Sequence, residues 1–293
     1  MADDPREFGR RTREQAGLFD SILQSRRERK RRRFLDKLAT GYDGPVILAE
    51  GDSWFEYPIS EDLLVPLGEK YAIFSLAKAG DSFAEVADQD ELFPTLDNPP
   101  PGREFHIVML SLGGNEVMGH IEDFVHDNDP ARPDENYLLP SFAPMLEGVR
   151  DKFDAIVRRI VESGPQHVIL HGYDYPDPRF PREPGEPLNG AQWIGPPLMH
   201  ERRIGQVTTW RAIANRMVED FNTMLAVVAA RPQYQGRVHA VRLLGTIGKR
   251  SKIQPADPAL WVDEIHGTDE GFRRLAWKFE TVIDGVWEGM QVG

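Results

Sequence analysis

Short apolar runs alternate with longer amphipathic stretches from residue 45 to the end of the chain. Apolar runs of this length are typical of strands buried on both faces of a parallel sheet, and the amphipathic stretches are typical of the helices that connect such strands. The runs predicted to be strands cover residues 46–50, 72–77, 106–112, 167–171 and 238–244. The alternation therefore predicts an α/β fold, a three-layer α/β/α sandwich with a five-stranded parallel sheet.

Helical periodicity fills the connections between these runs. The predicted helices cover residues 82–95, 142–163, 206–230 and 268–290. Ser82 is suited to cap the first of them, because Glu85 follows three residues later and the two can form a capping box. Gly164 and Pro165 are expected to stop the second.

Two connections are longer than a normal loop, at residues 116–141 and 173–205. Each follows a predicted strand at the edge where open α/β sheets bind ligands. We expect them to form walls or a lid over a site, while surface decoration fits the Pro- and Gly-rich 173–205 stretch equally well. Residues 41–293 are accordingly predicted to form one domain with two long insertions, after a basic helical extension at residues 1–40.

The basic extension differs in charge from the rest of the chain. It holds 12 Lys and Arg against 7 Asp and Glu, a net of +5, whereas the whole chain carries −12. We interpret the dominant run, Arg26–Arg33, as the solvated stretch of a helix, and a contact with phosphate or anionic lipid is the alternative. The apolar residues expected to touch the body of the protein are Leu18, Ile22, Phe34 and Leu38.

The composition argues against several classes of protein. The acidic balance disfavours a nucleic-acid binder. Cysteine is absent, which excludes disulfides, thiolate metal sites and a cysteine nucleophile. The sequence contains no run of about 18 apolar residues, so it predicts no integral membrane segment. The first residues lack the apolar core of a secretory signal. We expect a cytoplasmic protein, with leaderless export left open and the oligomeric state not set by the sequence.

A serine follows the first predicted strand directly, in the triplet Gly51-Asp52-Ser53. The carboxyl end of a parallel strand is where doubly wound sheets bind ligands, so Ser53 is a candidate nucleophile. Alone, the triplet is more typical of a turn. Gly80-Asp81-Ser82 repeats it after the second predicted strand, which shows that the triplet by itself decides nothing.

Two further polar segments lie at strand exits. Gly113 and Gly114 lead to Asn115 at the end of the third predicted strand, where a side-chain amide can donate to a developing oxyanion. Asp263 and His266 lie before the last helix, and their spacing lets the carboxylate orient an imidazole that acts as a base. Each segment alone also fits a structural role, as a polar turn or as a capping Asp beside a surface His.

In this order the segments resemble the blocks of the SGNH hydrolases, also called the GDSL esterase/lipase family, over residues 45–290. The matching blocks are Gly51-Asp52-Ser53, Gly80, Gly113-Gly114-Asn115 and Asp263-x-x-His266. The resemblance implies the flavodoxin-like sheet of that family. It also implies hydrolysis of carboxylic esters through an acyl-enzyme, with no cofactor and no metal.

The resemblance implies a role for each matching position. Ser53 is expected to be the nucleophile, His266 the general base and then the general acid, and Asp263 the partner of His266. The backbone N–H groups of Ser53 and Gly80, with the side chain of Asn115, are expected to form an oxyanion hole. In this register the second Gly-Asp-Ser triplet supplies a glycine donor and not a nucleophile.

Some positions depart from the family pattern. Glu116 follows Asn115 where the family often has Asp, which leaves open what supports that loop. Trp54 and Phe55 replace a smaller tail after the serine. We expect Phe55 to pack, and leave Trp54 open between packing and lining a substrate pocket. No Gly-x-Ser-x-Gly elbow surrounds Ser53, which disfavours the α/β-hydrolase family.

The leading hypothesis is therefore a serine esterase acting on acyl or acetyl esters of small alcohols, lipids or carbohydrates. Three alternatives stay open: an acyltransferase on the same fold, an exported enzyme that hydrolyses lipids, and an inactive binding module. The spacing of the remaining histidines and carboxylates, at His120, His126, Asp127 and Asp129, matches no metal loop. The histidines in or beside predicted strands, expected to be structural, are His106, His167 and His239.

Overall fold

The computed structural model describes residues 20–89, 91–100, 103–180 and 193–292. In these residues five parallel strands form one sheet in the order β2-β1-β3-β4-β5. The strands are β1 (Val46–Gly51), β2 (Ala72–Ser75), β3 (Ile107–Ser111), β4 (His167–His171) and β5 (Val238–Val241). This is the order of a doubly wound sheet whose switch point lies between β1 and β3. The predicted α/β fold with five parallel strands is confirmed.

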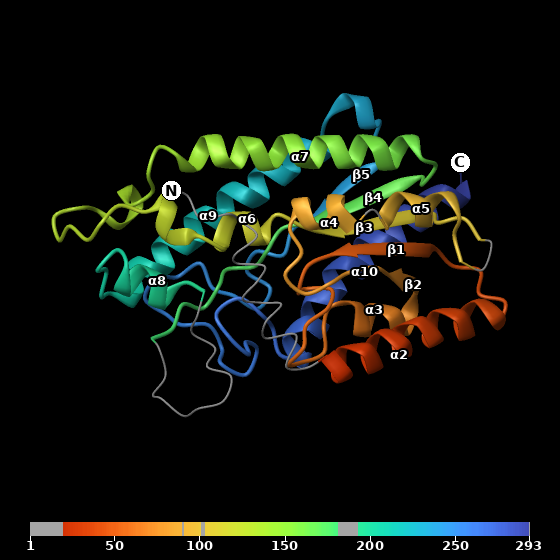
Figure 1. The fold of residues 1–293 in the computed structure, drawn as a ribbon, viewed down its shortest axis with the longest axis horizontal. Helices are drawn as coiled ribbons and strands as arrows, with labels where there is room; N and C mark the ends of the chain where they lie inside the picture. Colours follow the sequence, from red (N-terminus) through yellow and green to blue (C-terminus); the bar gives the residue numbers. More distant parts are fainter. Residues whose placement is uncertain (1–19, 90, 101–102, 181–192, 293) are drawn as a thin grey trace.

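Helices cover both faces of the sheet and complete the three-layer sandwich (Figure 1). One face is covered by α2 (Asp20–Ala39), α3 (Leu64–Lys70) and α10 (Asp269–Val292), and the other by α7 (Phe142–Glu162) and α9 (Val207–Ala229). The connections hold α4 (Phe83–Gln89), α5 (Leu92–Asp97), α6 (Gly114–Met118), α8 (Gly195–His200) and three 3₁₀ turns, η1 (Ile121–Phe124), η2 (Asp134–Asn136) and η3 (Pro232–Tyr234). None of the helices described is both long and apolar enough to cross a membrane.

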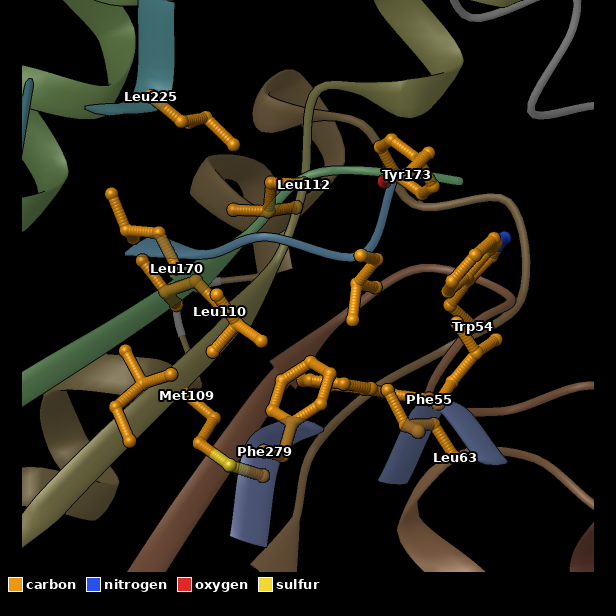
Figure 2. Close-up of a cluster of buried hydrophobic side chains, with 14 of the residues drawn as sticks. Trp54, Phe55, Leu63, Met109, Leu110, Leu112, Leu170, Tyr173, Leu225 and Phe279 are labelled. Atoms are coloured by element: carbon orange, nitrogen blue, oxygen red, sulfur yellow. The ribbon is translucent and has the colours of Figure 1, made fainter. Parts of the chain in front are cut away.

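The core extends beyond the sheet into the segment that follows β1. Every residue of β1 and β3 is buried. Figure 2 shows Phe55 and Leu63, which come after β1, in the same cluster as Phe279 of α10 and Leu110 of β3. The side chains of Phe55, Leu63 and Phe279 are fully buried. Burial of each such side chain stabilises the fold by ~1.5–3 kcal/mol, so the chain after Ser53 is held by the core itself.

Two predicted boundaries are wrong for physical reasons. The predicted helix over 82–95 is two helices, α4 and α5. Pro94 has no N–H for the i→i−4 bond of a continuous helix, and it falls instead in the first turn of α5, where no such bond is needed. The predicted strand over 238–244 ends at Val241, whose partner His171 is the last residue of β4. The ladder therefore stops where its neighbour stops.

The predicted packing of the basic extension is partly correct. Phe34 and Leu38 of α2 are buried, whereas Ile22 is 43% exposed. Leu18 lies outside the described residues. The buried pair anchors the second half of α2 beside β2, at the edge of the sheet.

The strand histidines have structural contacts. His167 Nδ1 on β4 and His239 Nε2 on β5 lie 3.0 Å apart. His106, just before β3, accepts a hydrogen bond from the backbone N–H of Val46 at 3.0 Å. Their predicted structural role is confirmed.

Candidate active site

Ser53, His266 and Asp263 form a continuous chain of contacts beyond the carboxyl end of β1. The Oγ of Ser53 lies 2.7 Å from Nε2 of His266. The Nδ1 of His266 lies 2.7 Å from Oδ2 of Asp263. All three side chains are buried, with His266 only 1% exposed. Because an ionised carboxylate can only accept, Nδ1 carries the proton in this contact and Nε2 is left free to accept from the serine hydroxyl.

The Asp263–His266 spacing is fixed by the backbone of the loop before α10. The Oδ1 of Asp263 accepts from the N–H groups of Ile265 at 2.8 Å and His266 at 2.7 Å. These bonds close a tight turn that brings the two side chains together. Burial alone would raise the pKa of the Asp263 carboxyl, but the His266 ring and the backbone N–H of Ile265 hold that pKa below its usual value. The carboxylate therefore stays ionised beside the imidazole.

The loop that carries Ser53 is tied to β3 through its neighbours. The backbone N–H of Asp52 donates to the carbonyl of Ser111 at 2.9 Å, and Ser111 Oγ donates to Asp52 Oδ1 at 2.7 Å. The hydroxyl of Tyr173 donates to Asp52 Oδ2 at 2.5 Å. Gly51 has a φ of +148°, and a Cβ there would overlap the carbonyl oxygen of Ser111. Glycine is thus required for β1 to approach β3 so closely.

Asn115 lies at the start of α6 and is joined to the loop after β2. Its Nδ2 donates to the carbonyl of Asp81 at 2.6 Å. The preceding residue, Gly80, has a φ of +84°, which favours glycine. An amide nitrogen has two N–H bonds, so a second donor remains on Nδ2 of Asn115. Two predicted oxyanion donors therefore lie on loops that this hydrogen bond joins.

Glu116 supports this arrangement in the position where a shorter Asp was expected. Its Oε1 accepts from the backbone N–H of Phe83, the first residue of α4, at 2.8 Å. Glu116 is buried, and burial raises the pKa of its carboxyl. The longer side chain thus links α6 to α4, which begins directly after the Gly80 loop.

The second Gly-Asp-Ser triplet has a different role. Ser82 Oγ bonds the carboxylate of Glu85, and the N–H of Glu85 donates back to Ser82 Oγ at 3.4 Å. The N–H of Ser82 also donates to that carboxylate, at 3.0 Å. The predicted capping box at the start of α4 is confirmed, and the hydroxyl of Ser82 is engaged in it.

A cleft lies beside the serine, with a total empty volume of about 410 Å³ including its open mouth. Ser53 and Asn115 line it together with the apolar side chains of Trp54, Met118 and Tyr173. Gly80 is not among the residues that line it. Two of the apolar residues come from the predicted insertions, so parts of both form walls of the cleft.

Trp54 packs against its neighbours and also lines this cleft. Its Nε1 donates to the carbonyl of Ile265 at 3.1 Å, on the loop that carries His266. Its ring also meets Tyr173 edge to face, at a centroid distance of 5.0 Å, and Figure 2 shows the two side by side. Phe55 packs in the core as predicted, with its ring 5.4 Å from that of the buried His171.

The sequence did not single out Tyr57, and it offered Glu264 only as a carboxylate that could compete with Asp263 for His266. Tyr57 donates from its hydroxyl to Asp263 Oδ2 at 2.7 Å, and its ring stacks on His266. Glu264 accepts four backbone N–H groups of the 173–205 insertion, those of Arg179, Trp193, Ile194 and Gly195, at 2.7–2.9 Å. No motif marks either role, because each residue acts through contacts made only in the fold.

Comparison with known proteins supports the fold and goes no further. No family model matches the chain, and no curated protein matches it. A solved structure described as "The structure of a putative platelet activating factor from Streptococcus pneumonia" superimposes with a TM-score of 0.50 at 15% identity. The match covers 92% of this chain and 97% of the other. At that identity the likeness shows that the two chains share the α/β/α fold.

Proposed function

We propose that the protein is a serine hydrolase of carboxylic esters, of the SGNH type. The observation that carries the proposal is the pair of successive 2.7 Å contacts from Ser53 to His266 and from His266 to Asp263. These residues lie at the carboxyl end of the strands, near the switch point of the sheet, where doubly wound folds bind ligands.

In the proposed first step Ser53 attacks the carbonyl carbon of the ester. As the Oγ–C bond forms, the hydroxyl proton moves to Nε2 of His266, and the negative charge of Asp263 stabilises the resulting imidazolium. The carbonyl oxygen becomes an oxyanion. The second Nδ2–H of Asn115 and the backbone N–H groups of Ser53 and Gly80 are its proposed donors.

Collapse of this intermediate breaks the bond to the alcohol oxygen, which takes the proton from His266 Nε2. A water molecule then repeats the sequence: His266 removes its proton, the acyl–Oγ bond breaks, and the acid leaves while Ser53 regains its proton. The apolar walls of the cleft, Trp54, Met118 and Tyr173, suit the hydrocarbon part of the acyl group.

The test uses a fluorophosphonate probe and p-nitrophenyl acetate on the purified full-length protein. We expect the probe to label the wild type, and peptide mass spectrometry to assign the adduct to Ser53. Ser53→Ala should lose both labelling and ester hydrolysis. Ser82→Ala is the matched control from the second triplet, and it should keep the label at Ser53 while losing about 1 kcal/mol of stability with the helix cap.

Two outcomes would contradict the proposal. One is a wild-type protein that is folded but neither labelled nor active on any ester of graded acyl length. The other is an adduct assigned to a serine other than Ser53.

A further inference from the structure

Tyr57 contacts the candidate base and its carboxylate partner at the same time. Its hydroxyl donates to Oδ2 of Asp263 at 2.7 Å, and the same oxygen lies 2.7 Å from Nδ1 of His266. Its ring lies on the imidazole of His266, with centroids 4.0 Å apart and planes inclined by 18°. Tyr57 is only 2% exposed, so water does not compete for these contacts.

The backbone of Tyr57 is held by the basic helix α2. Nη1 of Arg26 donates to the carbonyl of Tyr57 at 2.6 Å and also to that of Ser60. Nζ of Lys30 donates to the carbonyl of Phe55 at 2.8 Å. Two cations of the basic run thus bond to the backbone carbonyls of Tyr57 itself and of residues shortly before and after it.

Side chains of α2 also neutralise two buried carboxylates of the same segment. The guanidinium of Arg27 makes a two-pronged contact with the carboxylate of Glu56. Lys30 Nζ lies 2.6 Å from Oδ2 of Asp62, which is fully buried. The expectation that this run is simply solvated is therefore wrong for Arg26 and Lys30, whereas Arg27 makes its contact from a side chain that is 50% exposed. The positive charge of this run suggested a contact with anionic lipid, but these cations bind groups within the protein.

We propose that Tyr57 is a positioning residue for the reaction proposed above, and that α2 holds it in place through Arg26 and Lys30. The stacked ring fixes the plane of His266 so that Nε2 faces Ser53 Oγ. The hydroxyl shares the charge of Asp263 Oδ2 with the imidazole. Because this donation draws charge away from His266, it limits how strongly Asp263 stabilises the imidazolium.

The first test separates the hydroxyl of Tyr57 from its ring. Tyr57→Phe keeps the stacking and leaves Oδ2 of Asp263 to His266 alone, while Oδ1 still accepts from the backbone N–H groups of Ile265 and His266. We expect the acid limb of the kcat/KM–pH profile to move up by about half to one pH unit, with the plateau rate kept within tenfold. Tyr57→Leu removes the stacking as well and should lower kcat by roughly 100-fold with KM little changed. An acid limb that does not move in Tyr57→Phe would overturn the role of the hydroxyl.

A second readout does not depend on activity. The Nδ1 proton of His266, observed by NMR in the folded protein without substrate, should shift in Tyr57→Phe, because a carboxylate with fewer donors accepts more strongly. If the wild type hydrolyses no ester but this proton shifts, the positioning contact stands and the proposed function fails. If esters are hydrolysed and the proton does not shift, the function stands and the role of Tyr57 fails.

The role of α2 is tested by replacing, one at a time, two arginines of its basic run. Arg26→Gln removes the donor to the Tyr57 carbonyl, and we expect kcat to fall five- to tenfold with KM unchanged. Arg32→Gln, on the exposed side of the same helix, is the matched control and should stay within twofold of the wild type. Equal effects of the two variants would show that α2 acts only through general charge. Far-UV circular dichroism of both variants checks that the helix is intact.

Discussion

The side-chain Nδ2 of Asn115 donates to the backbone carbonyl of Asp81 at 2.6 Å. This bond ties the loop after β3 to the loop after β2, so Asn115 and the neighbouring Gly80 are held as one unit. A donor fixed in this way needs no rearrangement when charge develops on a substrate oxygen, and such preorganised donors contribute most to oxyanion stabilisation.

Replacing Asn115 by Ala should therefore lower kcat for p-nitrophenyl acetate by roughly 10²–10³-fold, with a small change in KM. Loss of the hydrogen bond to Asp81 also makes both loops more mobile, and this lowers kcat further. Asn136→Ala, an exposed asparagine on η2, is the matched control and should leave kcat unchanged. A loss below tenfold in Asn115→Ala would mean that this side chain does not face the reacting oxygen.

Glu264 should anchor the wall of the cleft to the loop that carries Asp263 and His266. Its two carboxylate oxygens accept four backbone N–H groups, and one donor, Trp193, also brings its ring near His266, at a centroid distance of 6.3 Å. Glu264→Gln would turn an NH₂ group toward two of these donors. We expect a loss of roughly 2–4 kcal/mol in unfolding free energy and faster hydrogen exchange at residues 193–195.

The control for this substitution is Glu288→Gln, which makes the same chemical change at an exposed position on α10 and should alter stability by less than about 0.5 kcal/mol. Urea unfolding and hydrogen exchange of the three proteins give the comparison. Unchanged exchange at Ile194 and Gly195 in Glu264→Gln would show that the insertion is held by other contacts.

The sequence was sufficient for the sheet, because buried parallel strands leave apolar runs that stand out against amphipathic helices. It was also sufficient to bring Ser53 and His266 to one edge, since Ser53 directly follows β1 and His266 lies in the connection between β5 and α10. It could not indicate Tyr57 or Glu264. Their partners are a carboxylate and backbone N–H groups about 70–200 residues away along the chain, and nothing in local composition marks such a contact. Pro94 gave a readable sign that the helix over 82–95 is divided, but helical periodicity on both sides of the break between α4 and α5 concealed it.

Gly51 should tolerate no side chain. Its φ of +148° is strained for any other residue, and a Cβ would overlap the carbonyl oxygen of Ser111 on the neighbouring strand. Gly51→Ala should destabilise the protein by roughly 2–5 kcal/mol and displace Ser53, two residues on.

Gly285→Ala is the matched control. This helical glycine is exposed with open space around it, and alanine there should stabilise α10 by about 0.5–1 kcal/mol. Thermal unfolding of both variants measures these changes in stability. A Gly51→Ala protein as stable as the wild type would show that β1 and β3 can move apart.

His171 should make the protein sensitive to acid. It is 1% exposed, its ring is surrounded by Trp54, Phe55, Tyr173 and Phe279, and among the described residues its Nε2 has no hydrogen-bond partner. Burial lowers the pKa of His171 to about 4, against an ordinary value of 6.5. Between pH 6.5 and 4 the unfolded chain therefore binds a proton at His171 that the folded protein does not bind. The unfolding free energy falls as the pH drops through this window.

Between pH 7 and pH 5 this one group should remove about 2 kcal/mol from the unfolding free energy. His171→Phe keeps a ring in the aromatic cluster and has no proton to bind, so its stability should fall by about 2 kcal/mol less than that of the wild type over the same interval. Urea unfolding at both pH values, on wild type and variant, gives the difference directly. Other buried groups contribute equally to the two proteins and cancel. Parallel pH dependences of wild type and variant would show that His171 can take up a proton without unfolding.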